Sequence, residues 1–154
     1  MSLLRIVVDR ISDWRPYFPT DDLITAGDYL AQAPNPQQDS ATHVINLCGG
    51  LEYLETGYYV SLLAQARGQR VLPTVETLNQ LSRKALVDLQ LESLAPLMDE
   101  LSRRGALQGD AFQLRLMFGE CLQPGLSKLA RRLFDRLPCP LLEARFQHRQ
   151  GSGA

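Results

Sequence analysis

The residues of this sequence that are suited to chemistry follow its apolar, strand-like segments. Asp9 closes the segment LLRIVVD, the turn NLCGG follows HVI, and a third segment, AFQLRLM, is followed by an aromatic residue and a glycine. In α/β proteins, ligands bind beyond the carboxyl ends of parallel strands, near the point where the strand order reverses. The strand-end candidates for a ligand site are therefore Asp9, Asn46, Cys48, Gly49, Phe118 and Gly119.

The turn NLCGG offers two kinds of chemistry. Cys48 would be a nucleophile if a base or a cation stabilised its thiolate, and Gly49 and Gly50 leave amides free at a helix start, where anions bind. The pattern is neither GxGxxG nor a P-loop with its lysine, and we recognise no catalytic trio or pair of carboxylates. The favoured alternatives are a small buried cysteine, a capping role for Asp9, and a turn that only joins a strand to a helix.

A helix is predicted over residues 51–67, directly after this turn. Its apolar stripe, at spacings of three and four, consists of Leu51, Leu54, Tyr58, Leu62 and Ala66. Gly57 and Ser61 are small residues on one helical face and predict a close approach to a neighbouring segment. Tyr58 and Tyr59 point to different sides, so one of them is a candidate surface contact. We include Tyr58, Tyr59 and Ser61 among the candidate binding residues.

The order of the predicted elements indicates the fold class. Strands are predicted over residues 3–9, 43–49, 70–74, 111–120 and 141–149, with a further short strand in LITAGDYLAQ. Helices are predicted over residues 51–67, 74–90, 95–104 and 126–137. Parallel strands need crossovers of this kind, and right-handed crossovers place helices on both faces of the sheet. We therefore predict an α/β three-layer sandwich with a mostly parallel sheet, forming a single domain over residues 1–149. Residues 150–154 are expected to be a linker or tail.

Net charge, cysteine spacing and apolar runs limit the partners and the cellular location that can be expected. The formal net charge is −1, which gives no basic face for nucleic acid or an anionic membrane. The three cysteines lack CxxC spacing, so neither a disulfide framework nor a zinc site is expected. The sequence begins without a signal-peptide pattern and contains no apolar run long enough to span a bilayer. We expect a cytoplasmic protein.

Six segments together resemble a known family. They are IVVD, NLC, GYYVSLLAQARG followed by LPT, LRLMFGE, and LFDRLPCPLLEARF, in this order over nearly the whole chain. They are similar to the RimK-like ATP-grasp N-terminal domain (RLAN), a Rossmann-like module that precedes the catalytic region of RimK-type ligases. The resemblance implies an activity that joins a carboxylate to an amine through an acyl-phosphate, with ATP and magnesium, on a small amino-acid or peptide substrate.

The catalytic part of such a ligase is not recognisable in these residues. We find no glycine-rich phosphate loop with its lysine, and no late acid and asparagine set for magnesium. The chain is therefore predicted to be a non-catalytic substrate-binding or docking domain that holds no ATP or metal by itself. Its partner would be an ATP-grasp catalytic domain, in cis or in trans. The alternatives are a stand-alone module that forms a homodimer through an edge strand at 141–149, and a small hydrolase or transferase using Cys48 or Asp9.

Overall fold

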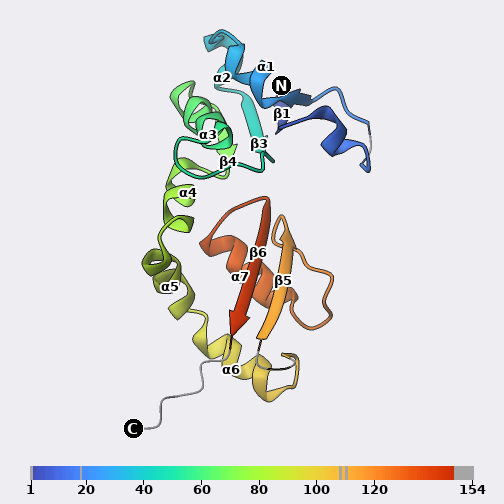
Figure 1. Cartoon of the computed structure of the whole chain (residues 1–154), viewed down its shortest axis with the longest axis vertical. Helices are drawn as coiled ribbons and strands as arrows, with labels where there is room; N and C mark the ends of the chain where they lie inside the picture. Colours follow the sequence, from blue (N-terminus) through green and yellow to red (C-terminus); the bar gives the residue numbers. More distant parts are fainter. Residues whose placement is uncertain (1, 18, 108, 110, 148–154) are drawn as a thin grey trace. The chain divides into compact units, whose positions relative to one another are not determined.

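A computed structural model (Figure 1) describes residues 2–17, 19–107, 109 and 111–147. The chain divides into two compact units, Met1–Leu86 and Val87–Ala154. Each unit has its own hydrophobic core. The predicted domain over residues 1–149 stays a prediction, as does the tail at 150–154, which lies outside the described residues.

The first unit is built on a parallel four-stranded sheet with the order β2-β1-β3-β4. Its strands are β1 (Leu3–Val8), β2 (Leu23–Thr25), β3 (Thr42–Asn46) and β4 (Arg70–Leu72). The central strands are short β-branched runs, as expected for buried parallel strands. The helices of this unit are η1 (Ile11–Trp14), α1 (Ala26–Ala31), α2 (Pro36–Asp39), α3 (Thr56–Ala66) and α4 (Val75–Leu81). The predicted α/β class with a parallel sheet flanked by helices is confirmed.

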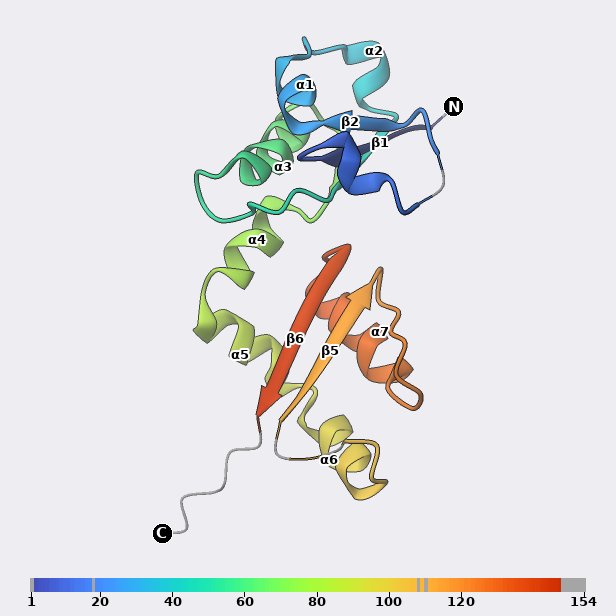
Figure 2. The same ribbon diagram turned by 45° about the vertical axis from the view of Figure 1, so that its right-hand side comes forward.

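The core of the first unit lies between the sheet and the helices α1 and α3 (Figure 2). Val7 of β1 and Val44 of β3 pack there with Tyr29 of α1 and with Val60 and Ala64 of α3. Since α1 and α3 each connect two parallel strands, they run back across the sheet, and their last residues return to its amino-terminal edge. Each edge of the sheet therefore brings together residues that are distant in sequence.

Helix α3 differs from its prediction. It begins at Thr56, not at residue 51, and its buried residues are Gly57, Tyr58, Val60, Ser61 and Ala64. Leu54 lies before the helix with a φ of +70°, and Leu62 is exposed. The predicted stripe was therefore displaced, because the period of three and four continued through residues that form a loop. The helix predicted over residues 74–90 ends earlier, because α4 stops at Leu81. Thr74 caps its start, since the Thr77 amide donates to Thr74 Oγ1 at 3.1 Å.

The second unit contains an antiparallel pair of strands, β5 (Ala111–Met117) and β6 (Leu141–Gln147). Helix α5 (Lys84–Glu92) crosses the boundary between the units, and α6 (Ala95–Arg103) and α7 (Ser127–Arg136) follow. Leu114 and Leu116 of β5 pack with Leu97 of α6 and Leu133 of α7. The two strands form their own sheet and do not join the parallel one.

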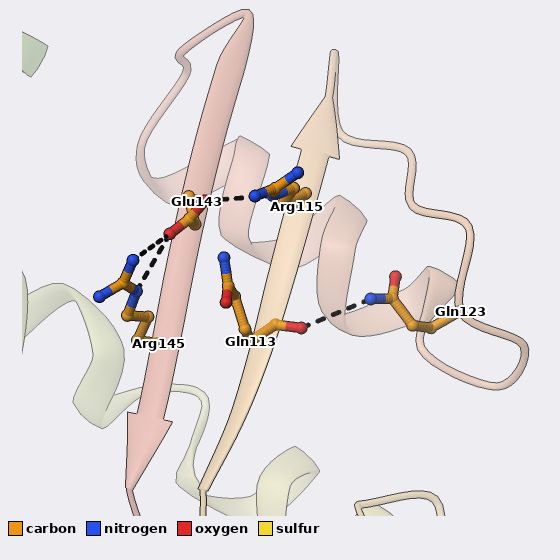
Figure 3. A network of polar contacts seen from close by, with 5 residues as sticks. All are labelled: Gln113, Arg115, Gln123, Glu143 and Arg145. Atoms are coloured by element: carbon orange, nitrogen blue, oxygen red, sulfur yellow. Dashed lines mark hydrogen bonds and ion pairs between the residues drawn. The ribbon is translucent and has the colours of Figure 1, made fainter.

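The opposite face of the β5–β6 pair is polar (Figure 3). Glu143 lies between two arginines, 3.2 Å from Arg115 Nε and 2.9 Å from Arg145 Nη2. The hydrogen bond from Arg145 is the main cause of a lowered pKa of Glu143. Both arginines are largely exposed to solvent, so this network is a solvated surface whose ion pairs add little to stability.

Candidate functional site

The strand order of the first unit reverses between β1 and β3. The chain adds β2 on one side of β1, then β3 and β4 on the other, and ligands of such sheets bind where β1 and β3 end. Asp9 directly follows β1, and Asn46 is the last residue of β3. The Gly49 amide donates to Asp9 Oδ2 at 2.8 Å. The structure thus brings together Asp9, Asn46, Cys48 and Gly49, four of the residues that the sequence selected.

Asn46 is the centre of a buried network of hydrogen bonds. Its side chain is only 2% exposed, and Nδ2 donates to the Gly57 carbonyl oxygen at 2.7 Å and to Ser61 Oγ at 2.9 Å. Its Oδ1 accepts from the Cys48 amide at 3.2 Å, and Ser61 Oγ donates to the Pro73 carbonyl oxygen at 2.7 Å. We name Asn46 and Ser61 the polar clamp. Because buried polar groups must be paired, the clamp joins the end of β3 to α3 and to the segment after β4.

Cys48 is not placed for nucleophilic chemistry. Its side chain is 4% exposed, and burial, followed by the nearby Asp9 carboxylate, raises the pKa of its thiol to about 12. The thiolate is the reactive form, so this cysteine stays protonated at neutral pH. The favoured sequence interpretation, a small buried hydrophobic residue, agrees with this environment.

Gly57 explains the close packing of α3 against the turn. A Cβ atom at this position would lie 2.3 Å from the Gly50 carbonyl oxygen and 2.8 Å from Cβ of Cys48. Neither contact is compatible with a real side chain, so only glycine fits here. The prediction that Gly57 and Ser61 allow a close approach is in accord with this geometry. The polar part of NLCGG is therefore used mainly for packing.

An exposed apolar surface surrounds the first turn of α3. Tyr58 is buried, and its ring makes edge-to-face contacts with the rings of Tyr53 and Tyr59, at centroid distances of 5.4 and 6.2 Å. Tyr53 is 68% exposed, Tyr59 40%, Leu54 59% and Leu62 42%. We name the exposed residues Tyr53, Leu54, Tyr59 and Leu62 the tyrosine surface. The left-handed backbone of Leu54 is unusual for a leucine, and such strained residues gather at functional sites.

Phe118 and Gly119 have a different setting from the other candidates. They lie in the second unit, after an antiparallel strand, and have φ values of +50° and +80°. Together with hydrogen bonds between Met117 and Glu120 in both directions, these angles describe a type I′ turn. A Cβ atom at Gly119 would lie 2.8 Å from Cβ of Phe134. Phe118 and Gly119 therefore form a packed turn after β5, which is not a strand of the parallel sheet.

Two backbone amides of the turn after β3 already donate to side chains of the protein. The Cys48 amide is bonded to Asn46, and the Gly49 amide is bonded to the Asp9 carboxylate, which takes the position of an anionic ligand. Within the described ranges, no group of three histidine, cysteine, aspartate or glutamate residues is arranged to hold a metal. No helix of those same ranges is long and apolar enough to cross a membrane.

A family model matches most of the chain. The family model of the RimK-like ATP-grasp N-terminal domain matches residues 26–153. The chain belongs to this family. The match to RLAN confirms the resemblance seen in the sequence, and it implies association with an ATP-grasp domain. No curated protein and no solved structure matches the chain.

Not all candidate residues lie within the segment that matches the RLAN family model. The polar clamp, Cys48, Gly49 and the tyrosine surface lie inside residues 26–153, whereas Asp9 lies before them. Tyr53 and Leu54 are exposed but were not among the candidates, and the helical period had placed Leu54 in a buried stripe. The helix begins after Glu55, whose side chain makes no capping hydrogen bond, so no capping residue marks this start in the sequence.

Proposed function

We propose that this RLAN domain is the accessory domain of a RimK-like ATP-grasp carboxylate–amine ligase and docks onto the catalytic region through the tyrosine surface. In this proposal, the ATP-grasp region binds ATP and magnesium and forms the acyl-phosphate. The domain described here catalyses no step by itself. It supplies a fixed wall beside the cleft that holds the amino-acid or peptide substrate.

The environment of the reactive residues supports a non-catalytic role. The thiol of Cys48 is buried and has a raised pKa. The hydrogen-bonding groups of Asn46 are directed to other parts of the protein. A hydrolase or transferase based on Cys48 would need a neighbouring group that stabilises the thiolate, but the Asp9 carboxylate raises the pKa of the thiol and so disfavours the thiolate.

The tyrosine surface is the observation that carries the docking proposal. Tyrosine combines a large apolar ring with a polar hydroxyl, and it is enriched in protein interfaces. The Tyr53 ring packs against the buried Tyr58, so part of its conformational freedom is already lost before a partner binds. Preorganised aromatic residues of this kind contribute strongly to binding. The family provides the partner, since RLAN implies an ATP-grasp domain.

The test is calorimetric binding of this chain to the accompanying ATP-grasp catalytic region. The double variant Tyr53→Ser/Tyr59→Ser removes both exposed rings and is expected to weaken binding at least about tenfold. Tyr17→Ser is the matched control, since Tyr17 is also half exposed but lies outside the tyrosine surface. It is expected to leave the affinity within about twofold of the wild type. Absence of binding by the wild-type chain, or equal affinity of the double variant, would refute the docking proposal.

The homodimer alternative has a separate test. In the described part of the chain, β6 pairs with β5 and with no further strand, and an unpaired strand edge can pair with another molecule. Analytical ultracentrifugation of the chain over a range of concentrations measures this directly. Our proposal predicts a monomer in the absence of the catalytic region, and a stable dimer would favour the alternative.

A further inference from the structure

A polar pocket lies at the amino-terminal edge of the parallel sheet, at the opposite edge from the tyrosine surface and the polar clamp. Its volume is about 280 Å³. It is lined by the beginnings of β1 and β3, the end of α1, the segment around α2, and the residues after α3. The lining residues on which the argument depends are Arg5, Tyr29, Gln38, Asp39, Arg67 and Gln69. All of them belong to the first unit.

The floor of the pocket is held in one arrangement by hydrogen bonds. The hydroxyl group of the buried Tyr29 donates to Gln69 Oε1, and Gln69 Nε2 donates to Asp39 Oδ1 at 2.9 Å. Asp39 Oδ2 accepts from the Asn35 amide at 2.9 Å. These bonds fix the orientation of both the amide and the carboxylate. Each Asp39 oxygen accepts one protein hydrogen bond and so keeps a further lone pair for a ligand.

Two arginines contribute positive charge to the same pocket. Arg5 lies on β1 two residues before the core residue Val7, so its side chain is on the sheet face that carries α1 and α3. Its Nη1 donates to the Leu4 carbonyl oxygen. Across the described residues, no carboxylate lies within 4.0 Å of either Arg5 or Arg67. A half-buried guanidinium without a carboxylate partner is uncommon on a face that otherwise forms a core.

The end of α1 positions Arg67, but not all hydrogen-bond donors of its guanidinium group have a partner among the described residues. Its Nη1 and Nη2 donate to the carbonyl oxygens of Tyr29 and Gln32, and its guanidinium lies over the Tyr29 ring, 5.1 Å from the centroid. The Nε donor is buried and has no acceptor in the part of the chain that the structure describes. The guanidinium thus keeps hydrogen-bonding capacity in a fixed position.

We propose that this pocket binds the α-amino carboxylate end of a small molecule, such as a free amino acid. The ligand carboxylate would be held by the guanidinium groups of Arg5 and Arg67. Its ammonium group would lie at Asp39 and the Gln38 side chain. The lining thus holds groups of both signs, so a zwitterion can place its carboxylate beside the two arginines and its ammonium group beside the aspartate.

The helix ends at the pocket favour a zwitterion over a phosphate. Gln32 and Arg67, which directly follow α1 and α3, line it, and the carboxyl end of a helix carries partial negative charge. Phosphate sites in proteins commonly use the opposite, amino-terminal end of a helix. A phosphate dianion would therefore meet unfavourable dipoles here, whereas an ammonium group beside Asp39 would be stabilised by them.

The test measures the binding of a panel of free L-amino acids to the whole chain by isothermal titration calorimetry. At least one amino acid is expected to bind with a dissociation constant of about 1 mM or tighter. The amide of the best ligand lacks the carboxylate, and its deaminated analogue lacks the ammonium group. Each is expected to bind at least about tenfold more weakly, and inorganic phosphate is expected not to compete. These comparisons need no variant and hold whether or not a variant folds.

Variants then locate the site. Arg5→Gln is expected to weaken binding at least about tenfold, and Asp39→Asn is expected to weaken the amino acid more than its deaminated analogue. Arg70→Gln is the matched control, because Arg70 is exposed at the start of β4 and does not line the pocket. It should leave the affinity unchanged within about twofold.

Three results would overturn the proposal. They are no binding of any amino acid at about 10 mM, phosphate binding in preference to amino acids, and unchanged affinity in a folded Arg5→Gln variant. The readout uses this chain alone. It therefore succeeds or fails independently of the docking surface.

Discussion

Removal of the Asn46 side chain distinguishes a structural clamp from a ligand-binding residue. Asn46→Ala deletes three buried hydrogen bonds, those to the Gly57 carbonyl, to Ser61 Oγ and from the Cys48 amide. Each bond contributes about 1 kcal/mol, and the Cys48 amide that is left unpaired adds about 1 kcal/mol more. The free energy of unfolding should therefore fall by about 4 kcal/mol, well above the effect of a typical substitution.

Equilibrium unfolding in urea, followed by circular dichroism, measures this change. Asn79→Ala is the control, since Asn79 is an exposed asparagine on α4, and it should change stability by less than about 0.5 kcal/mol. Asn46→Asp keeps the acceptor for the Cys48 amide, but it places a buried carboxylate oxygen against the Gly57 carbonyl oxygen, so its loss should be at least as large as that of Asn46→Ala. A loss of less than about 1 kcal/mol for Asn46→Ala would refute the clamp. Asn46 would then be a candidate for contact with a ligand.

Three further predictions concern packing and titration. Burial raises the pKa of Cys48 from 9.0 to about 12, so at pH 8 its alkylation, followed by peptide mass spectrometry, should be about a thousandfold slower than in the unfolded chain. The same shift should make stability fall as the pH rises from 9.0 to about 12, because the unfolded thiol ionises first. Gly57→Ala should destabilise the protein by about 2 kcal/mol or more, whereas Gly27→Ala, which meets no atom within 4 Å, should be neutral or stabilising in thermal unfolding. The pKa of Glu143 is lowered from 4.5, chiefly by Arg145, so the contribution of Glu143 to stability is present above pH 4.5 and is lost as the pH falls below it. Glu143→Gln should remove that part of the acid dependence of unfolding. An unchanged dependence of stability on pH below 4.5 would contradict this reasoning.

Local sequence was sufficient to predict the positions of most strands and the switch-point turn. The short β-branched run LLRIVVD predicts a buried strand, and the rule on strand ends selected both Asp9 and Gly49 as candidates. Those two residues are joined by a hydrogen bond in the structure. The close packing at Gly57 was also predictable, because small residues at helical spacing admit near neighbours.

Other features depend on contacts that sequence periodicity does not contain. Leu54 continues the helical period, but its φ of +70° places it in a loop, and nothing in the residue type indicates that angle. The alternation of Phe112, Leu114 and Leu116 is typical of a strand with one exposed face, which favours an antiparallel sheet. The structure agrees with that pattern, since β5 pairs with β6 in a separate sheet. The charged Arg5 within the apolar run of β1 likewise indicates a polar site, since Arg5 lines the polar pocket.

The most direct test of the central claim is reconstitution of ligase activity. This chain, the accompanying ATP-grasp catalytic region, and a mixture of both would each be assayed for amine-dependent release of phosphate from ATP. We predict no turnover by this chain alone and full coupling of ATP hydrolysis to ligation only when both are present. Turnover by this chain alone, or equal coupled activity of the catalytic region without it, would contradict the account.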